Sequence, residues 1–428
     1  MSGNENKPLV PKLRFPKFRD AGEWNTVELG KLSRLLTERV GSSGCTPYTI
    51  SSGVGLISQE EKLGRIIAGN SLKNYLVLQD NDFAYNKSAT KAYPQGYIAR
   101  YAGDERAAVP NSIFTCFRVN QNQVIPTFLD ALFTSNLHGK WLRTRIAVGA
   151  RAHGSLQVSD DDLMATPVPL PNSTNSLEEQ QKIADSLSSL DDLIAAETYK
   201  LDTLKTHKKG LMQQLFPREG EAVPQMRLPE FRNAEDWKEW KVGELGEVIT
   251  GNTPSTSKPQ YYGGEYNFVS PADISEQRFI ENTKTTLSPL GFEQTRKIPA
   301  GSVLFVCIGS TIGKVAQNMY SCATNQQINS LVPSSNFSGD FIYYLLLRES
   351  NRIAELAGNQ AVPIINKSTF SDVSVLCPQE KEEQERVAGY LGTLDELIYA
   401  QSQKIDALKT HKKGLMQQLF PALDEVGA

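Results

Sequence analysis

The chain has 428 residues, of which 39% are hydrophobic and 22% are charged. These fractions are close to globular averages, so they exclude a wholly disordered chain and a membrane bundle, and the length predicts two or more domains. The net charge of −3 excludes a large basic excess, so any binding of nucleic acid would depend on local positive charge or on partners.

The N-terminal segment MSGNENKPLVPKLRFPKF is interrupted by prolines and lacks the apolar core of a signal peptide. The most apolar later run, FIYYLLL at 341–347, is too short to cross a bilayer. We therefore expect a cytoplasmic protein without a membrane partner. Five scattered cysteines without a CxxC pair and four dispersed histidines predict neither a disulfide framework nor a zinc site.

A segment of similar pattern opens each half of the chain. LRFPKFRDAGEW occupies residues 13–24, and MRLPEFRNAEDW occupies residues 226–237. After each segment, short β-branched and aromatic runs alternate with Gly, Pro and Asn, which is typical of a small mixed α/β domain. These two variable middles lack an obvious sequence counterpart in each other, so we expect two modules that perform the same task on different targets.

Basic residues gather near the end of the first variable middle. A stretch without any acidic residue contains Lys140, Arg143, Arg145 and Arg151 together with a tryptophan. Such a cluster can follow a phosphate backbone. The alternative interpretation is an ordinary polar loop, since loops without acids are common.

A long repeat follows each variable middle. Residues 178–217 align without a gap on residues 382–421, and both copies end in THKKGLMQQLFP. Aliphatic residues recur with alternating spacings of four and three, a period of 3.5 that is typical of a coiled coil. Early acids, late lysines and a final proline predict one helix of roughly 60 Å per copy. The alternative is an ordinary helix packed on its own domain.

Two equivalent units in one chain most readily pack about a twofold axis, which predicts antiparallel long helices whose apolar stripes face each other. The identical helix ends are then candidate docking surfaces for two copies of one partner. Recent duplication without selection on this stretch is the alternative. The candidate docking residues are His207, Lys208, Lys209, Leu211, His411, Lys412, Lys413 and Leu415.

The second variable middle contains an amide run, Asn325, Gln326 and Gln327, and amide side chains can read adenine edges with two hydrogen bonds. The nearby segment GSTIGKV is not a nucleotide site, because it has three residues between its glycines instead of four and ends in valine instead of Ser or Thr. The sequence also lacks GxSxG, HExxH and Asn-Pro-Pro-aromatic motifs. We therefore expect a chain without catalytic activity.

Two variable halves, each followed by a near-identical long helix, resemble the DNA-specificity subunit of type I restriction-modification systems. The local signatures are LRFPKF, LKTHKKGLMQQLFP and GNTPS followed by YYGGEYNFVSPADI, and the resemblance covers roughly residues 13–421. It implies an α+β fold with two mixed α/β target recognition domains, related by pseudo-twofold symmetry and separated by two long antiparallel coiled-coil helices. The implied parts are recognition domain 1 (1–172), spacer helix 1 (173–217), a linker (218–225), recognition domain 2 (226–378), spacer helix 2 (379–421) and a tail (422–428).

The resemblance implies a bipartite, asymmetric site in duplex DNA, with each domain reading one half-site in the major groove. Half-sites about one helical turn apart, ~34 Å, suit helices of this length. Two modification subunits, which bind S-adenosylmethionine and methylate adenine, and two ATP-driven restriction subunits are the implied partners. Cofactors, including magnesium, would belong to those partners and none to this chain.

The segments AYNKS, GSTIGK and TNQQIN match patterns of such recognition domains. With the basic cluster, the candidate DNA-binding residues are Tyr85, Asn86, Lys87 and Lys91 in the first half, and Asn252, Thr253, Ser255, Lys258, Tyr261, Tyr262, Ser310, Thr311, Lys314, Asn325, Gln326 and Gln327 in the second. Two rivals stay open: an enzyme of an unrecognised class, and a coiled-coil scaffold whose domains bind proteins or peptides.

Overall fold

The chain forms two compact units, unit 1 with Met1–Ala196 and Asp406–Ala428, and unit 2 with Glu197–Ile405. Both long helices therefore contribute one segment to each unit. The computed structural model describes residues 9–51, 53–146, 154, 156–358 and 362–421.

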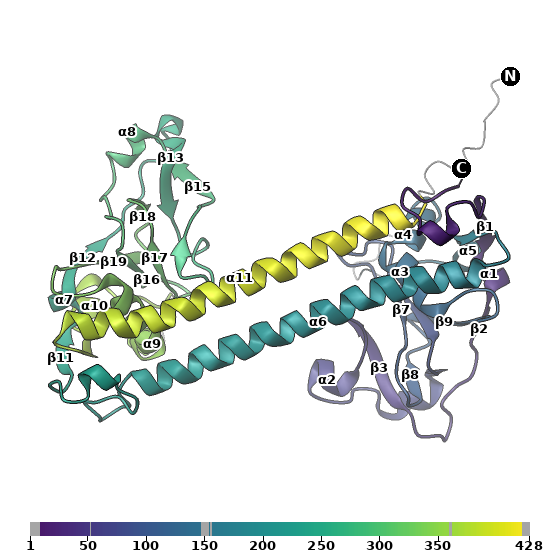
Figure 1. The fold of residues 1–428 in the computed structure, drawn as a ribbon, viewed down its shortest axis with the longest axis horizontal. Helices are drawn as coiled ribbons and strands as arrows, with labels where there is room; N and C mark the ends of the chain where they lie inside the picture. Colours follow the sequence, from purple (N-terminus) through teal and green to yellow (C-terminus); the bar gives the residue numbers. More distant parts are fainter. Residues whose placement is uncertain (1–8, 52, 147–153, 155, 359–361, 422–428) are drawn as a thin grey trace. The chain divides into compact units, whose positions relative to one another are not determined.

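The two long repeats form continuous helices, as their period and end signals predict (Figure 1). Helix α6 spans Ser176–Leu215 with 40 residues, and α11 spans Lys381–Leu419 with 39 residues. Each has two glutamates in its first turn, where negative charge favours the positive end of the helix dipole. The predicted helices and their lengths are confirmed by these bounds.

Unit 1 contains two four-stranded sheets, ordered β2-β9-β6-β7 and β4-β3-β8-β5, and the antiparallel pair β1-β10. Its strands are β1 (Trp24–Glu28), β2 (Ser33–Leu35), β3 (Thr46–Ser51), β4 (Gly55–Ser58), β5 (Leu76–Leu78), β6 (Asp82–Asn86), β7 (Tyr97–Arg100), β8 (Ala107–Val109), β9 (Phe114–Val119) and β10 (Pro167–Pro171). Its short helices are η1 (Pro16–Phe18), α1 (Leu29–Leu32), α2 (Gln59–Leu63), η2 (Gly69–Asn74), α3 (Pro126–Thr134), α4 (Leu137–Leu142) and α5 (Asp160–Met164).

Aromatic packing forms the centre of unit 1. Phe83 and Phe117 stack with ring centroids 5.2 Å apart, and Phe133 packs edge-on against both. The end of α11 joins this core, since Phe420 lies edge-on against Phe128 with centroids 5.5 Å apart. The last turn of the second long helix thus completes the core of the first domain.

Unit 2 contains a five-stranded sheet ordered β12-β19-β16-β17-β14, a three-stranded sheet ordered β15-β13-β18, and the antiparallel pair β11-β20. Its strands are β11 (Lys238–Lys241), β12 (Gly246–Thr250), β13 (Tyr262–Val269), β14 (Phe279–Ile280), β15 (Thr285–Leu287), β16 (Val303–Val306), β17 (Val315–Asn318), β18 (Ala323–Thr324), β19 (Ile328–Pro333) and β20 (Ser374–Cys377). Its short helices are η3 (Pro229–Phe231), α7 (Val242–Leu245), η4 (Pro259–Tyr261), α8 (Pro289–Phe292), α9 (Gly339–Glu355) and α10 (Lys367–Ser371).

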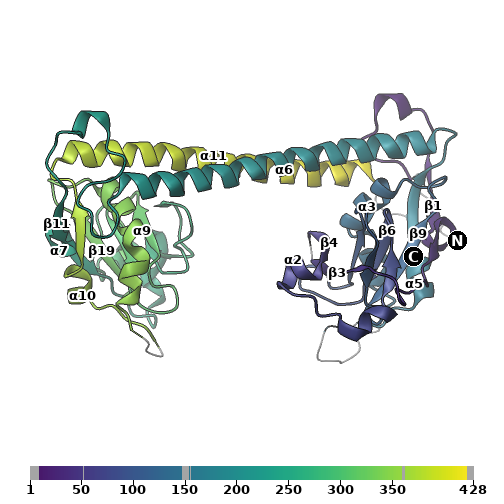
Figure 2. The ribbon, with the colours of Figure 1, turned by 90° about the horizontal axis from the view of Figure 1, so that it is seen from below.

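The core of unit 2 lies between α9 and the five-stranded sheet (Figure 2). Phe341 of α9 is fully buried and stacks on Phe216, with centroids 5.4 Å apart. Phe216, which directly follows α6, also meets the ring of Trp237 edge-on. The first long helix therefore completes the core of the second domain in the same way.

Within each unit, segments of α6 and α11 run in opposite directions. In unit 2, Lys208 of α6 is paired with Asp395 of α11 at 2.5 Å, and Gln401 donates a hydrogen bond to the Glu197 carboxylate at 2.6 Å. In unit 1, Lys412 is paired with Asp191 at 2.5 Å. Gln401 and Lys404 both donate hydrogen bonds to the Glu197 carboxylate. These bonds, with that from Gln401 as the larger cause, hold the pKa of Glu197 below its ordinary value.

In the part of the chain that the structure describes, no helix has both the length and the apolarity needed to cross a bilayer. The five cysteines are free thiols, and burial raises the pKa of Cys307 to about 12. Among the described residues, no group of three His, Cys, Asp or Glu side chains could hold a metal ion.

Candidate nucleic-acid interface

Three polar segments of unit 2 meet at one end of its five-stranded sheet. Strand register places the last residue of β12, Thr250, opposite Asn329, and the last residue of β16, Val306, opposite Ile328 at the start of β19. The loops after β12 and β16 therefore lie beside the turn that precedes β19. This end of the sheet brings together Asn252 and Thr253, Ser310 and Thr311, and the amide run.

The loop after β12 is held close to the turn before β19. A Cβ atom on Gly251 would collide with the carbonyl oxygens of Thr324 and Asn325, so only glycine allows this approach. Both ends of the Asn252 amide are used, because Nδ2 donates to the Gln294 carbonyl at 2.9 Å and Oδ1 accepts from the backbone N–H of Arg296 at 2.8 Å. Asn252 therefore fixes the loop, and its amide is already bonded within the domain.

The three amides of the predicted run have different roles. Asn325 Nδ2 donates to Gln327 Oε1 at 2.9 Å, and Asn325 Oδ1 accepts from the backbone N–H of Gln327 at 3.0 Å. Gln327 Nε2 in turn donates to the Ile308 carbonyl at 3.3 Å. Gln326 is exposed, and its Oε1 accepts from the Thr253 hydroxyl at 2.7 Å. Gln326 is thus the member of the run that is placed to meet a ligand.

The other candidates of the second half are partly used within the domain. Tyr262 donates its hydroxyl to the Pro254 carbonyl at 2.7 Å, and Lys314 donates to the Ile274 carbonyl at 2.8 Å. Lys258 donates to the Tyr261 hydroxyl at 3.2 Å, and the exposed Ser255 hydroxyl bonds Ser257 at 2.8 Å. Ser255, Lys258 and Lys314 are exposed, although the Lys314 ammonium is bonded within the domain, whereas Tyr261 and Tyr262 are half-buried.

Sequence reasoning missed Arg296, an exposed residue beside the same loop. Its guanidinium donates to the Thr250 carbonyl at 2.7 Å. This contact places a positive charge at the end of the sheet where the polar segments meet. The adjacent pair Arg296 and Lys297 was the available sequence signal, but isolated basic dipeptides are too frequent to single it out.

The basic cluster of unit 1 lies on α4 and the turn that follows it. Lys140, Arg143 and Arg145 are exposed, and the Arg145 guanidinium lies over the Trp141 ring at 3.2 Å from its centroid. Arg151 lies outside the described residues. Trp141 Nε1 donates to the Asp162 carbonyl at 3.0 Å, which places the acidic helix α5 beside α4. The cluster is therefore free of acidic residues along the sequence but has acidic residues near it in the fold.

The structure corrects the prediction for Tyr85. Its side chain is fully buried in the core, its hydroxyl donates to the Gln95 carbonyl at 2.8 Å, and burial raises its pKa. A residue enclosed in this way is not available to DNA. Asn86 and Lys87, at the end of β6, are half-buried, and the Lys87 ammonium lies 3.4 Å from Asp160, whereas Lys91 is exposed.

The candidate docking residues also divide between the inside and the surface. Lys208 and Lys412 form the ion pairs between the long helices, and Leu211 and Leu415 pack against the cores of units 2 and 1. For these four residues, contacts within the molecule account for the repeated sequence. The four that stand at the surface are His207, Lys209, His411 and Lys413.

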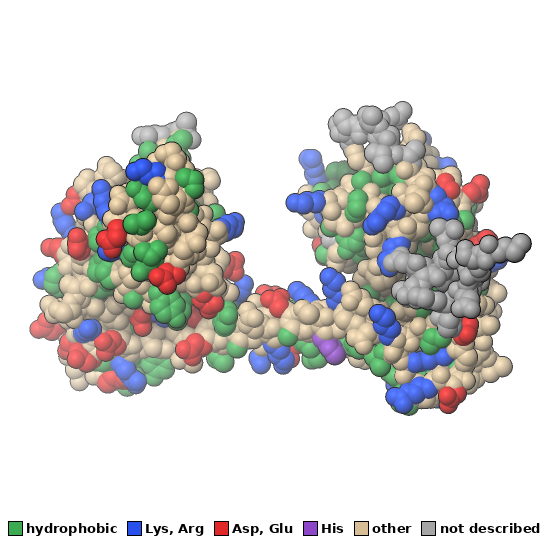
Figure 3. All heavy atoms as spheres, turned by 90° about the horizontal axis from the view of Figure 1, so that it is seen from above, with side chains coloured by type: hydrophobic (Ala, Val, Ile, Leu, Met, Phe, Trp, Pro, Cys, Tyr) green, Lys and Arg blue, Asp and Glu red, His purple; other side chains and the backbone are tan. Residues whose placement is uncertain are grey.

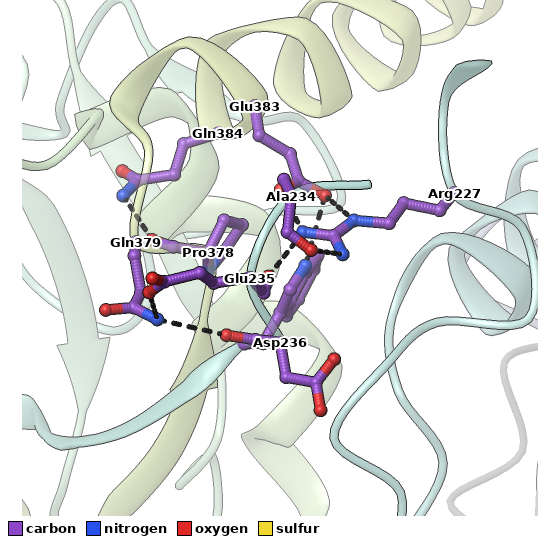
Figure 4. Close-up of polar contacts among 9 residues, drawn as sticks. Arg227, Ala234, Glu235, Asp236, Pro378, Gln379, Glu383 and Gln384 are labelled. Carbon is purple, nitrogen blue, oxygen red and sulfur yellow. Dashed lines mark hydrogen bonds and ion pairs between the residues drawn. The ribbon is translucent and has the colours of Figure 1, made fainter. Parts of the chain in front are cut away.

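A buried arginine–glutamate pair joins each opening segment to the start of a long helix. In unit 2, Arg227 donates to both carboxylate oxygens of Glu383 at 2.9 and 2.8 Å, and Trp237 Nε1 adds a third bond to Glu383 at 3.1 Å. Figure 4 shows the Arg227 guanidinium between this carboxylate and the carbonyls of Ala234 and Glu235. Its polar groups are therefore fixed from two sides.

Unit 1 repeats this arrangement with Arg14 and Glu179, whose two bonds measure 2.7 and 2.8 Å. The next residue of each helix repeats a second contact, because Gln180 accepts from the backbone N–H of Ile125 at 2.9 Å and Gln384 accepts from that of Ser338 at 2.8 Å. Two domains with dissimilar sequences are thus attached to their helices by the same chemistry.

Surface charge is local. On the face shown in Figure 3, Lys and Arg side chains of unit 1 stand at several separate places, among uncharged polar and apolar side chains. This distribution fits a chain whose net charge is only −3. On this face the positive charge of unit 1 is thus divided among separate groups.

Two dissimilar domains, attached by the same contacts to two near-identical helices, are the features that comparison with known proteins explains. Residues 58–206 and 234–410 match the family described as the type I restriction modification DNA specificity domain. The chain belongs to this family. Both matched segments include part of a variable domain and most of a long helix, so the family covers both halves.

Individual specificity subunits are similar over most of their length. The type I restriction enzyme HindI specificity subunit of Haemophilus influenzae is 26% identical over 64% of this chain and 72% of its own length. The putative MjaX specificity subunit of Methanocaldococcus jannaschii is 24% identical over 76% of this chain and 74% of its own length.

Solved structures share the fold. The S subunit of a type I restriction-modification system from M. genitalium has a TM-score of 0.60 at 14% identity, covering 96% of this chain and 99% of that one. A chain from a structure on assembly and conformational transition of a type I R-M system has a TM-score of 0.54 at 20% identity, covering 93% and 98%. Because these identities are low, the structural likeness is evidence for a shared fold alone.

Proposed function

We propose that this chain is a DNA-specificity subunit that recognises a bipartite, asymmetric duplex site and directs adenine methylation and restriction by partner subunits. Residues 1–172 and 226–378 are the proposed recognition domains, each reading one half-site. The observation that carries this proposal is that dissimilar domains are attached by the same buried arginine–glutamate contact to near-identical helices. Two different domains that are attached in the same way to similar helices suit the recognition of two different half-sites.

The proposed architecture is a pseudo-twofold pair of recognition domains held by an antiparallel coiled coil. Support comes from contacts that recur in both halves: the pair Asp191–Lys412 corresponds, repeat for repeat, to Asp395–Lys208. In such a pair Glu197 and Gln401, which are equivalent positions of the repeat, would meet near the axis. Helices of this length would hold half-sites about one turn of DNA apart, ~34 Å.

The proposed partners are two modification subunits, which bind S-adenosylmethionine, and two restriction subunits, which use ATP and magnesium. In this arrangement the chain itself is not catalytic and supplies sequence recognition. The surface residues His207, Lys209, His411 and Lys413 stand at corresponding places near the two helix ends, so they are the proposed docking residues. Partner subunits would also supply phosphate contacts that a chain of near-neutral charge lacks.

Adenine methylation mapped across a genome tests this function directly. The chain is expressed with the modification subunit encoded beside it, and cells lacking only the chain serve as the control. We expect a new bipartite methylated motif that depends on the chain. A stable complex with an active methylase but without any motif would favour the scaffold alternative, and turnover by the purified chain alone would favour an enzyme.

A further inference from the structure

We propose that Thr253 is a positioning residue that orients Gln326 to read an adenine in the half-site of the second recognition domain. This inference rests on the proposed function, since it assigns a base-reading pair within a domain already proposed to contact DNA. It follows from how the two loops that carry these side chains are fixed.

The Thr253 loop is fixed by contacts that do not involve Gln326. The backbone N–H of Gly251 donates to the Ile328 carbonyl at 3.1 Å, and the missing side chain at this position lets the loop lie directly on the turn before β19. Asn252 bonds Gln294 and Arg296 on its other side. Thr253 therefore directly follows two residues that are held in place, Gly251 and Asn252.

The turn that carries Gln326 is fixed in the same manner by its neighbours. Asn325 and Gln327 bond each other, and Gln327 also bonds the Ile308 carbonyl and, through its own carbonyl, the backbone N–H of Cys307 at 2.8 Å. The side-chain amides of Asn325 and Gln327 are therefore bonded within the domain. The middle residue projects from a rigid turn into solvent.

The bond from Thr253 sets which way the Gln326 carboxamide faces. The hydroxyl donates to Oε1 at 2.7 Å, and in the described part of the chain no protein atom accepts a hydrogen bond from Nε2. A carboxamide oxygen has two lone pairs, so one remains available. The exposed edge of Gln326 thus offers one acceptor and one donor side by side.

This donor and acceptor pattern matches the major-groove edge of adenine. Glutamine reads adenine by accepting from N6 and donating to N7 at the same time. A side chain that is already oriented loses less rotational freedom when it binds, which favours the correct base. The Arg296 guanidinium donates to the carbonyl of Thr250, three residues before Thr253, and its positive charge there suits a phosphate next to the base.

The test compares methylated motifs directed by the full chain in complex with its modification subunit. The variants are Gln326→Ala, Thr253→Val and Thr253→Ser, with Thr256→Val as the matched control, since Thr256 is an exposed threonine of the same loop. All altered side chains are at the surface, and recovery of the intact complex on gel filtration checks folding. The readout is the methylated fraction for each base at each motif position.

We expect the wild type to give a bipartite motif with an A·T pair that Gln326→Ala makes degenerate, with discrimination at that position falling roughly 5- to 150-fold. Thr253→Val should weaken the same position to a smaller extent, while Thr253→Ser and Thr256→Val keep it. The other half-site should stay unchanged in every variant. A uniform loss of methylation would indicate a structural role and overturn the inference.

Three further outcomes separate this inference from the proposed function. If the wild type gives a bipartite motif and Gln326→Ala leaves every position unchanged, or relaxes a G·C pair, the adenine assignment is wrong while the proposed function stands. If Gln326→Ala relaxes an A·T pair but Thr253→Val does not, the positioning role of Thr253 is wrong. If the wild type directs no motif, both fall together.

Discussion

The imidazole of His138 is buried in unit 1, where it packs edge-on against the rings of Tyr85 and Phe133 and its Nε2 donates to the Gly96 carbonyl at 3.2 Å. Burial lowers its pKa from 6.5 to about 4. The unfolded chain binds the His138 proton more tightly than the folded chain does. The contribution of this group to the unfolding free energy is therefore fully present above pH 6.5 and is lost as the pH decreases towards 4. The expected loss is about 3 kcal/mol.

Replacing this group should therefore change the acid sensitivity of unit 1. We expect the melting temperature of His138→Phe to fall less than that of the wild type between pH 6.5 and pH 4, as measured by thermal denaturation in a pH series. The aromatic replacement keeps most of the packing and removes the proton site. Parallel curves for the two proteins would show that His138 does not control this transition.

Residue roles were only partly predictable, because exposure depends on strand order. The segment AYNKS predicts Tyr85 as a DNA-binding residue, yet β6 lies between β7 and β9, and four successive residues, from Asp82 to Tyr85, are buried. A strand covered on both faces lacks the alternation that would reveal which side chains point inward. The amide run was found because its three residues are adjacent, but only the fold separates Gln326 from its two bonded neighbours.

At the scale of elements, the buried Arg227–Glu383 pair should dominate the attachment of α11 to unit 2. Both side chains are less than a tenth exposed. Removal of one partner leaves a buried charge without compensation, so Arg227→Met should cost about 3–5 kcal/mol of unfolding free energy. Adding Glu383→Leu should recover part of this loss, since both charges are then absent. Chemical denaturation measures both variants, and an equal or larger loss in the double variant would contradict this account.

The contact between Glu197 and Gln401 interrupts the apolar stripes of both long helices. Replacing both residues with leucine would extend both apolar stripes, with Lys208 and Lys412 as their remaining polar positions, and a longer apolar seam favours packing of the two helices. We expect the double variant to melt at a higher temperature than the wild type. Lys404→Ala is the matched control, because it removes only the exposed ion pair with Glu197 and should change stability little.

Helices and opening segments were predictable because their signals are local: a period of 3.5, acidic first turns and a terminating proline. Sheet order was not, because it depends on pairings between distant segments. Strand β1 pairs with β10, and β13 pairs in parallel with the short strand β18. The repeated helix ends predict docking surfaces, whereas Leu211 and Leu415 pack inward. One sequence alone does not distinguish an internal contact from a partner contact.

At the scale of the whole molecule, each variable domain depends on a helix end from the other half of the sequence. Phe216 and Phe420 are equivalent residues of the repeat, and they lie in the cores of unit 2 and unit 1. Truncation of such a buried ring costs about 3–5 kcal/mol. We expect Phe216→Ala to reduce hydrogen-exchange protection in residues 226–378, and Phe420→Ala to reduce it in residues 24–171.

Mass spectrometry of exchanged peptides distinguishes these regions, and each variant is the control for the other. Since the two substitutions are chemically identical and lie in identical local sequences, any difference between them reports where the ring packs. If both variants lower hydrogen-exchange protection in the same domain, the assignment of Phe216 to the core of unit 2 and of Phe420 to the core of unit 1 is wrong.

The position of Phe420 also has a consequence for biosynthesis. The domain that it completes begins near the N-terminus, yet the ring itself is translated about 250 residues after β10, the last strand of that domain. At ~5–20 residues per second, the nascent domain waits roughly 10 to 50 s with an open apolar surface. A ribosome that stops early releases a chain whose first domain is unfinished, which exposes incomplete products to chaperones and proteases before they can compete for DNA.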